Sequence, residues 1–333
     1  MSPPPRNPVG QTLEVRDLSI AFPTRRGQVR VVDHVCLSIG AGEIVGVIGE
    51  SGSGKTLTAL AVLGMLPRGA LIESGRILLG GESLLDKSER ERRAIRGDRV
   101  AYIPQDALRS LNPTLRIGVQ VGEPLALHRA TPWSVAKRKA VELLAAVHLR
   151  DPEKRAEEYP HQFSGGMQQR AMIAMGLSLE PQLLIADEPT TALDVTVQAQ
   201  VLQLVREIRR EHRTSILFIT HDLGVVVDLC DRVYVMYAGA VVEEGSVDRI
   251  FERPSHPYTR GLLRATPVLH GPREALIPIP GQAPLARDRP TGCRFVDRCA
   301  LAIGSCQSPP PWVEVESGHR ALCFRAGEAE VAA

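Results

Sequence analysis

One stretch of eight residues has the composition of a loop that binds phosphate groups. It runs Gly49, Glu50, Ser51, Gly52, Ser53, Gly54, Lys55 and Thr56, and it fits the pattern of glycine, four free positions, glycine, lysine and a hydroxyl residue. Glycine lets the backbone wrap tightly, so that successive N–H groups can point at phosphate oxygens. Lys55 would reach the β- and γ-phosphates of a nucleotide, and the Thr56 hydroxyl would bind Mg²⁺. The alternative is a glycine-rich turn without a ligand.

Two adjacent carboxylates follow a second apolar run. Leu183–Ala186 leads directly into Asp187 and Glu188, and ligands bind at the carboxyl ends of parallel strands. Asp187 is placed to hold Mg²⁺ through water, and Glu188 is placed to orient and polarise an attacking water molecule. Taken alone, the pair could equally be two solvated charges at the end of a strand.

A histidine follows the next apolar run. Ile216–Ile219 leads through Thr220 to His221. A histidine there could hydrogen-bond a γ-phosphate or the attacking water, whereas a lone histidine is more often structural. Its place after the strand that follows the carboxylates favours the functional interpretation.

The elements that must position these groups are short strands and the helices between them. Strands are expected at 44–48, 100–103, 183–186 and 216–219, because each apolar run is short and ends in glycine, proline or polar residues. A helix is expected at 57–66, directly after the phosphate-binding octet. Strands that alternate with helices predict an α/β fold with a mainly parallel, doubly covered sheet.

Composition and charge exclude several classes of protein. The chain has 333 residues with 40 Lys and Arg against 38 Asp and Glu, a net charge of +2, so there is no electrostatic case for binding nucleic acid. No apolar run approaches the ~18 residues of a membrane span. Residues 1–10 are rich in proline and lack the apolar core of a secretory signal. We expect a flexible tail at 1–10 and a protein that stays in the cytosol.

The character of the sequence changes near its C-terminus. Residues 254–290 hold eight prolines, which should exclude a regular helix or a central strand. Four cysteines then follow, at Cys293, Cys299, Cys306 and Cys323. Their spacing misses the paired knuckles of a zinc site, while four thiolates in one irregular segment suit a [4Fe–4S] cluster. Zinc and free thiols remain alternatives.

A further motif resembles the signature of ATP-binding cassette (ABC) proteins. It is the run Phe163-Ser164-Gly165-Gly166-Met167-Gln168-Gln169-Arg170, in which Phe163 and Met167 depart from the usual Leu-Ser-Gly-Gly-Gln. Other elements of that family match in order over residues 12–265. Phe22 lies where an aromatic residue commonly stacks on adenine. Gln105 resembles the Q-loop glutamine, Asp194 lies in a segment that resembles the D-loop, and His221 resembles the H-loop histidine.

The resemblance implies a fold, a site and a mechanism. The fold would be a P-loop ABC cassette over 11–265, with a RecA-like core, an antiparallel β subdomain and a helical subdomain at about 107–178, followed by an irregular C-terminal extension over 266–333 with the cysteine segment 293–323. Glu188, His221 and Gln105 would be catalytic, and Thr56, Gln105 and Asp187 would hold Mg²⁺. Two cassettes would close head to tail on two ATP molecules, each held between the octet of one subunit and Ser164, Gly165 and Gly166 of the other.

Three segments are similar to the ATPases of oligopeptide and dipeptide permeases. They are Gln105–Pro113, Pro254–Arg260 and the cysteine tail, and relatives with this tail are thought to bind a [4Fe–4S] cluster. The resemblance implies the ATP-hydrolysing subunit of a peptide importer, at the cytoplasmic face of the inner membrane. Its partners would be a second cassette (a paralogue rather than a copy), two membrane permease subunits and an extracytoplasmic substrate-binding protein, with no nucleic acid.

Three alternatives to peptide import remain. Nickel importers share parts of the pattern. Soluble cassette ATPases that act on nucleic acid or ribosomes usually carry coiled coils or two cassettes, which this chain lacks. Cassette ATPases of iron–sulfur assembly usually lack a long C-terminal extension.

Overall fold

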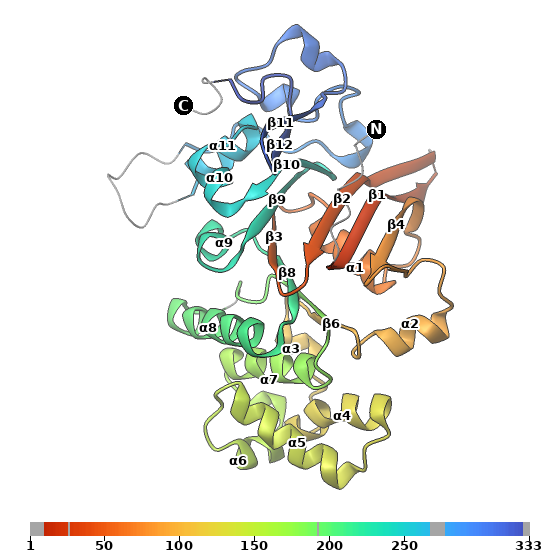
Figure 1. Cartoon of the computed structure of the whole chain (residues 1–333), viewed down its shortest axis with the longest axis vertical. Helices are drawn as coiled ribbons and strands as arrows, with labels where there is room; N and C mark the ends of the chain where they lie inside the picture. Colours follow the sequence, from red (N-terminus) through yellow and green to blue (C-terminus); the bar gives the residue numbers. More distant parts are fainter. Residues whose placement is uncertain (1–9, 26, 192, 267–276, 329–333) are drawn as a thin grey trace. The chain divides into compact units, whose positions relative to one another are not determined.

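The computed structural model describes residues 10–25, 27–191, 193–266 and 277–328 (Figure 1). The tail expected at 1–10 lies outside these residues, apart from its last one. The chain divides into two compact units. Unit 1 takes its residues from 1–38, 45–85 and 220–333, and unit 2 takes its residues from 39–44 and 86–219. Each unit contains its own part of the predicted site.

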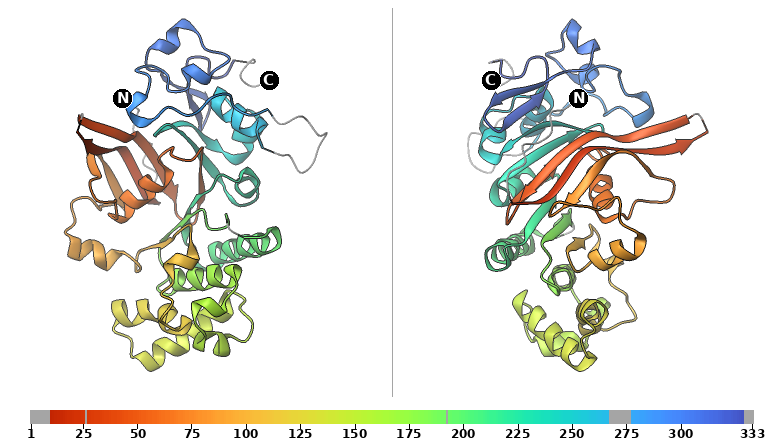
Figure 2. Two further views of the ribbon diagram at one scale, coloured as in Figure 1. Left: turned by 180° about the vertical axis from the view of Figure 1, so that it is seen from behind. Right: turned by 45° about the vertical axis from the view of Figure 1, so that its right-hand side comes forward.

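Unit 1 contains an antiparallel sheet of four strands, in the order β2-β1-β4-β5. Its strands are β1 (Gln11–Thr24), β2 (Gly27–Gly40), β4 (Leu71–Leu79) and β5 (Glu82–Ser83). Leu13, Val15 and Ile77 are fully buried, and Thr12 and Glu14, which alternate with the first two, are also buried, so both faces of β1 are covered at this point. Figure 2 shows the long β1 and β2 from two further sides.

A second set of strands in unit 1 carries the octet of residues 49–56, called the phosphate loop below. The order of these strands is β11-β12-β10-β9-β3. They are β3 (Ile44–Ile48), β9 (Arg232–Tyr237), β10 (Ala240–Ser246), β11 (Trp312–Glu316) and β12 (His319–Leu322). In this set β3 and β9 pair in parallel, and the other neighbours are antiparallel. The C-terminal extension therefore adds two strands to the edge that β10 would otherwise present.

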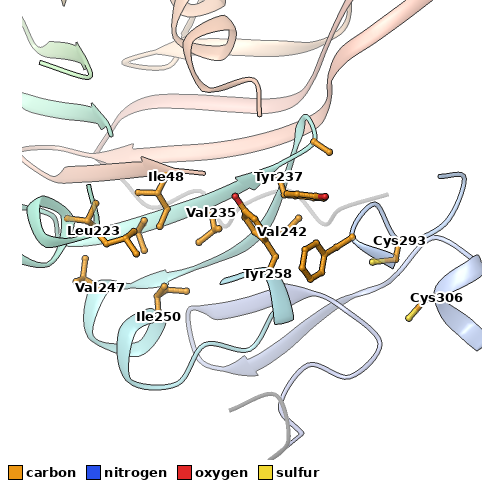
Figure 3. Packing of buried hydrophobic residues seen from close by; sticks show 14 residues of the cluster. Ile48, Leu223, Val235, Tyr237, Val242, Val247, Ile250, Tyr258, Cys293 and Cys306 are labelled. Atoms are coloured by element: carbon orange, nitrogen blue, oxygen red, sulfur yellow. The ribbon is translucent and has the colours of Figure 1, made fainter. Parts of the chain in front are cut away.

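Short helices complete unit 1. They are α1 (Lys55–Leu63), α9 (Leu223–Leu229), α10 (Val247–Glu252) and α11 (Pro257–Arg264), with 3₁₀ turns η2 (Ala286–Asp288), η3 (Val296–Arg298) and η4 (Gly304–Gln307). Figure 3 shows a buried cluster in which Tyr237 of β9 and Tyr258 of α11 lie with Val235, Val242 and Cys293. This cluster joins the strand set to the C-terminal extension.

Unit 2 holds three parallel strands in the order β8-β7-β6. They are β6 (Val100–Ile103), β7 (Leu183–Asp187) and β8 (Ser215–Ile219). Every residue of β7 and β8 is buried, as expected of parallel strands that are covered on both faces.

The helices of unit 2 occupy most of its sequence. They are α2 (Glu89–Ile95), α3 (Ala107–Ser110), α4 (Ile117–Arg129), α5 (Trp133–Ala146), α6 (Pro152–Glu157), α7 (Gly165–Leu177) and α8 (Val195–His212), with the 3₁₀ turn η1 (Pro160–Gln162). Helices α4, α5, α6 and α7 pack on one another, and α8 packs on α7 (Figure 1).

The four expected strands are confirmed, and two of them extend by one residue at an end. The helix expected at 57–66 begins earlier, at Lys55, and ends at Leu63, because Gly64 adopts the left-handed conformation (φ 62°) that ends helices. The expectation that proline excludes a helix from 254–290 was wrong for α11. Pro257 is the first residue of this helix, where the missing N–H costs no intrahelical hydrogen bond.

Candidate functional site

The phosphate loop runs from the end of β3 to the start of α1. Gly49 has φ 148°, and a Cβ atom there would lie 2.0 Å from the Met236 carbonyl oxygen of β9. Gly54 has φ 103° and is the N-cap of α1. Side chains larger than hydrogen do not fit at Gly49, so the close approach of β9 dictates this glycine as firmly as any ligand would.

The side chains of the phosphate loop fit a polyphosphate ligand. The Lys55 side chain is buried, and its Nζ donates to the carbonyl oxygens of Gly49 at 2.8 Å and Glu50 at 3.1 Å. Ser53 is 3% exposed, and its Oγ has no hydrogen-bond partner within the described structure. A buried hydroxyl without a partner is costly unless a ligand or water completes it. A positive side chain, an unsatisfied hydroxyl and a helix N-terminus together suit an anion.

Asp187 lies at the C-terminal end of β7 and is 2% exposed. The hydroxyl of Tyr102, from β6, donates to its Oδ2 at 3.1 Å. Burial, and then the negative charge of Asp187, raise the pKa of Tyr102, so the tyrosine stays a hydrogen-bond donor. Tyr102 therefore orients the carboxylate that the sequence assigned to Mg²⁺.

Glu188 follows Asp187 with a left-handed backbone (φ 48°), which is unusual for a residue other than glycine. Its N–H donates to the Ile219 carbonyl oxygen of β8 at 2.8 Å. Its Oε2 accepts hydrogen bonds from Gln105 Nε2 at 3.0 Å and from Thr191 Oγ1 at 3.1 Å. The sharp turn at Glu188 sends consecutive carboxylates to different partners, and unit 2 thus brings the predicted Gln105 and Glu188 together.

The signature segment (163–170) forms the start of α7. Ser164 is the N-cap, and its Oγ accepts from the Met167 N–H at 3.4 Å. A Cβ atom on Gly166 would lie 2.3 Å from Val197 Cγ1 of α8, whereas one on Gly165 would meet only Leu193 Cδ2, at 3.9 Å. The second glycine is therefore required by packing inside the chain, and the first is not.

An open hollow of about 840 Å³ lies beside this helix start in unit 2. Its lining includes Ser164, Gly166, Met167 and the basic residues Arg150, Arg155 and Arg170. No acidic residue occupies the first turn of α7. Arg155 pairs with Glu158 at 2.7 Å, which leaves Arg150, Arg170 and the helix N-terminus beside the hollow, and these suit a negatively charged group.

The other sequence-predicted residues occupy simpler settings. Asp194 is exposed and is the N-cap of α8, where it accepts from the Val197 N–H at 2.9 Å. His221 is exposed in the turn between β8 and α9, and Phe22 is half-buried on β1. Asp194 therefore caps helix α8, a role that its resemblance to the D-loop did not indicate.

The structure does not support the predicted [4Fe–4S] cluster. Cys293, Cys306 and Cys323 are buried and Cys299 is half-buried, and the Cys293 N–H donates to the Cys306 carbonyl oxygen at 2.9 Å. Within the described residues, no three His, Cys, Asp or Glu side chains come together as a metal-binding group. Burial raises the pKa of the Cys323 thiol to about 11. Cys293 and Cys306 belong to the buried cluster of Figure 3 and Cys299 packs against it, as small apolar side chains do.

Sequence reasoning missed Tyr102, Thr191, Tyr258 and Arg298. Tyr102 lies in the expected strand 100–103, so its place near the carboxylates could have been inferred from strand pairing. By contrast, Tyr258 and Arg298 contact Glu50 from positions 208 and 248 residues away. The resemblance over Pro254–Arg260 marks the segment that holds Tyr258, but no local pattern in the sequence indicates either contact.

Residues 32–191 match the family described as "ABC transporter", and residues 242–306 match "Oligopeptide/dipeptide transporter, C-terminal region". The structure is similar to "Dimeric structure of a post-hydrolysis state of the ATP-binding cassette MJ0796 bound to ADP and Pi", with a TM-score of 0.64 and 26% identity over 71% of this chain and 98% of that one. The fold is that of an ABC cassette, α/β with an antiparallel β subdomain and a helical subdomain, and the class is an ABC transporter ATPase.

Full-length relatives narrow the class. The "Probable peptide ABC transporter ATP-binding protein y4tR" of Sinorhizobium fredii is 46% identical over 319 residues, 95% of each chain. The "Oligopeptide transport ATP-binding protein OppD" of Salmonella typhimurium is 45% identical over 318 residues, 96% of this chain and 95% of that protein. This chain belongs to the family of ATP-binding subunits of oligopeptide ABC transporters, whose ATPase activity is coupled to peptide transport. None of the helices among its described residues has the length and apolarity to span a bilayer.

Proposed function

We propose that the chain hydrolyses MgATP with Glu188, Gln105 and His221 and thereby drives the import of dipeptides or oligopeptides. Residues 49–56 would bind the phosphates, with Lys55 on the β- and γ-phosphates. Thr56, Gln105 and Asp187 would hold the Mg²⁺ ion, which neutralises charge on the β- and γ-phosphates. Phe22 would stack on adenine.

Within this proposal the residues of unit 2 prepare the water molecule. Glu188 orients it and accepts its proton, because a carboxylate in hydrogen-bond reach of water can act as a general base. Gln105 and Thr191 already hold that carboxylate from one side. His221 contacts the γ-phosphate. Asp187 stays in place because Tyr102 donates to it.

Hydrolysis needs a second cassette in this proposal. Ser164, Gly165 and Gly166 meet the γ-phosphate that the phosphate loop of the partner holds, and Asp194 contributes from the same face. The open N-terminus of α7 supports this role, as does the dimeric state of the similar cassette MJ0796. A paralogous partner is favoured over a second copy. Loss of the γ-phosphate removes the contact between subunits, so the dimer reopens.

Transport requires partners that this chain does not contain. The proposed helical subdomain, at about 107–178 within a nucleotide-binding domain over 11–265, contacts two integral membrane permease subunits at the cytoplasmic face of the inner membrane. An extracytoplasmic binding protein delivers the peptide. The observation that carries the mechanism is the hydrogen bond from Gln105 to Glu188, because it unites two sequence-predicted groups at the end of β7.

The test uses the chain assembled with its permease subunits in lipid vesicles. ATP hydrolysis is measured with the binding protein added empty, with a peptide or with Ni²⁺. Stimulation of ATP hydrolysis by the peptide-loaded binding protein supports peptide import. Stimulation by the Ni²⁺-loaded binding protein but not by the peptide-loaded one assigns the cargo to nickel. Assembly with no membrane subunit, while the chain alone turns over ATP, would contradict the transport proposal.

A further inference from the structure

A partly buried ion pair joins the C-terminal extension to the phosphate loop. Arg298 Nη1 donates to Glu50 Oε2 at 2.9 Å, and Nη2 donates to Oε1 at 3.0 Å. The Arg298 side chain is 7% exposed and that of Glu50 is 29% exposed. A two-pronged pair of this kind fixes orientation as well as distance. The direction of one loop carboxylate is thus set by a residue outside the predicted cassette.

Arg298 is itself held in place by aromatic side chains. Its guanidinium lies over the rings of Tyr237 and Phe295, at 5.7 and 5.8 Å from their centroids, and it donates to the Tyr237 hydroxyl at 3.2 Å. Its Nε donates to the Pro280 carbonyl oxygen at 2.8 Å. Such contacts leave the Arg298 guanidinium little freedom to turn, so the site that binds the Glu50 carboxylate is formed in advance.

A second contact acts on the backbone of the same loop residue. The Tyr258 hydroxyl accepts a hydrogen bond from the Glu50 N–H at 2.9 Å. Tyr258 is fully buried and packs against Tyr237 and Phe295, with ring centroids 4.5 and 5.5 Å apart. Figure 3 shows Tyr237 and Tyr258 together in this cluster. Both the main chain and the side chain of Glu50 are therefore fixed by one aromatic cluster.

Glu50 poses an electrostatic problem in a loop that binds phosphates. Its carboxylate carries a negative charge beside the position of a polyphosphate anion, and like charges in a partly buried site repel more strongly than in water. Lys55 does not neutralise it by direct contact, because its Nζ bonds the carbonyl oxygens of Gly49 and Glu50. Among the described side chains, the ion pair of Glu50 is made by Arg298.

We propose that Arg298 is a positioning residue for nucleotide binding. It neutralises Glu50 and holds the carboxylate against the aromatic cluster, so that the phosphates meet the loop N–H groups and Lys55 without a competing negative charge. The proposal rests on ATP binding by the phosphate loop and is independent of the catalytic roles proposed above.

The test is a double-mutant cycle of the wild type, R298Q, E50Q and R298Q/E50Q in the full-length chain. The Kd for a non-hydrolysable ATP analogue with Mg²⁺ is measured by titration calorimetry. R298Q should raise the Kd about tenfold, or ~1.4 kcal/mol, because Glu50 is left uncompensated. Adding E50Q to R298Q should bring the Kd back to within about threefold of the wild type, since the repelling charge is gone. A residue that only supports the fold would show no such recovery.

Arg320 provides a matched control in the same extension. It pairs with Glu244 at 2.6 Å and lies over the Trp312 ring at 4.8 Å, with its side chain 18% exposed. Because it does not contact the phosphate loop, R320Q should leave the Kd within about twofold of the wild type. An unchanged Kd in R298Q, or a double variant that binds no better than R298Q, would overturn the proposal.

A conservative variant keeps the proposal testable if R298Q does not fold. R298K retains the charge but presents a single point instead of a fork. Its Kd should rise about threefold, and the increase should shrink with added salt because charges are screened. A Kd equal to that of the wild type at low salt would show that the fork does not position Glu50.

Discussion

The Gln105 amide donates to the Glu188 carboxylate at 3.0 Å, from a residue 83 positions earlier in the chain. Thr191 donates to the same oxygen, while Glu188 itself has a left-handed backbone. One oxygen of the carboxylate, Oε2, is therefore held by two donors before any water molecule binds. A strained backbone at such a position is typical of residues whose orientation matters to function.

Replacing Glu188 by glutamine should abolish turnover and spare nucleotide binding. The amide oxygen can still accept from Gln105 and Thr191, so the geometry is kept while the base is lost. We expect kcat for ATP hydrolysis to fall at least about a hundredfold and the ATP-bound dimer to accumulate. Steady-state hydrolysis and gel filtration with ATP check this. Turnover at the wild-type rate would exclude Glu188 as the water-activating carboxylate.

Lys55→Ala should act on binding itself. The variant removes the positive charge in reach of the loop phosphates, so the Kd for the ATP analogue should rise about tenfold or more. Lys139→Ala is the control, because Lys139 is exposed on α5 and pairs with Glu142 of the same helix at 2.6 Å. Calorimetric titration of both variants compares them. Equal affinities would show that the lysine does not contact the nucleotide.

The two signature glycines should differ in what they cost the fold. Gly166→Ala places a methyl group against Val197, and we expect the free energy of unfolding to fall by about 1–3 kcal/mol from overpacking. Gly165→Ala has room and should be neutral or stabilising by up to about 1 kcal/mol. Urea denaturation measures both. Similar losses in the two variants would refute the packing account of Gly166.

His256 should make stability depend on pH. It is buried, and its Nδ1 accepts from the Tyr258 N–H at 3.0 Å. Burial lowers the pKa of His256 to about 4, while the negative charge of Glu243 opposes the shift. Between pH 6.5 and 4 the unfolded chain binds a proton that the folded chain does not, so stability falls as the pH falls through this window.

The size of the effect can be isolated with one variant. From about pH 7.5 to about pH 5.0, His256 should cost about 2 kcal/mol of unfolding free energy. His256→Asn keeps an acceptor for the start of α11 but does not titrate, so it should lose about 2 kcal/mol less over the same interval. His319, which bonds the same Glu243, is present in both proteins and cancels. Parallel pH dependences would contradict the assignment.

Most residues of the candidate site could be predicted from local sequence patterns. Gly49 to Thr56, Asp187 and Glu188 could be located because short apolar strands ended next to them, and those strands are present. Longer-range relationships could not be found in this way. Nothing near Cys299 indicates that the preceding Arg298 bonds Glu50, since that contact depends on how η3 packs against β9. Cysteine spacing likewise records only order along the chain, and within the described residues the structure does not support the cluster predicted from it.

Arg298 is synthesised long after Glu50, the residue with which it pairs. The two residues are 248 positions apart, which at about 5–20 residues per second corresponds to roughly 12–50 s of translation. During that time the phosphate loop is already made but lacks Arg298, and for the first 208 positions it also lacks Tyr258. On the proposal above, a nascent chain interrupted before η3 would carry the nucleotide motif without Arg298 and would bind nucleotide more weakly than the complete chain.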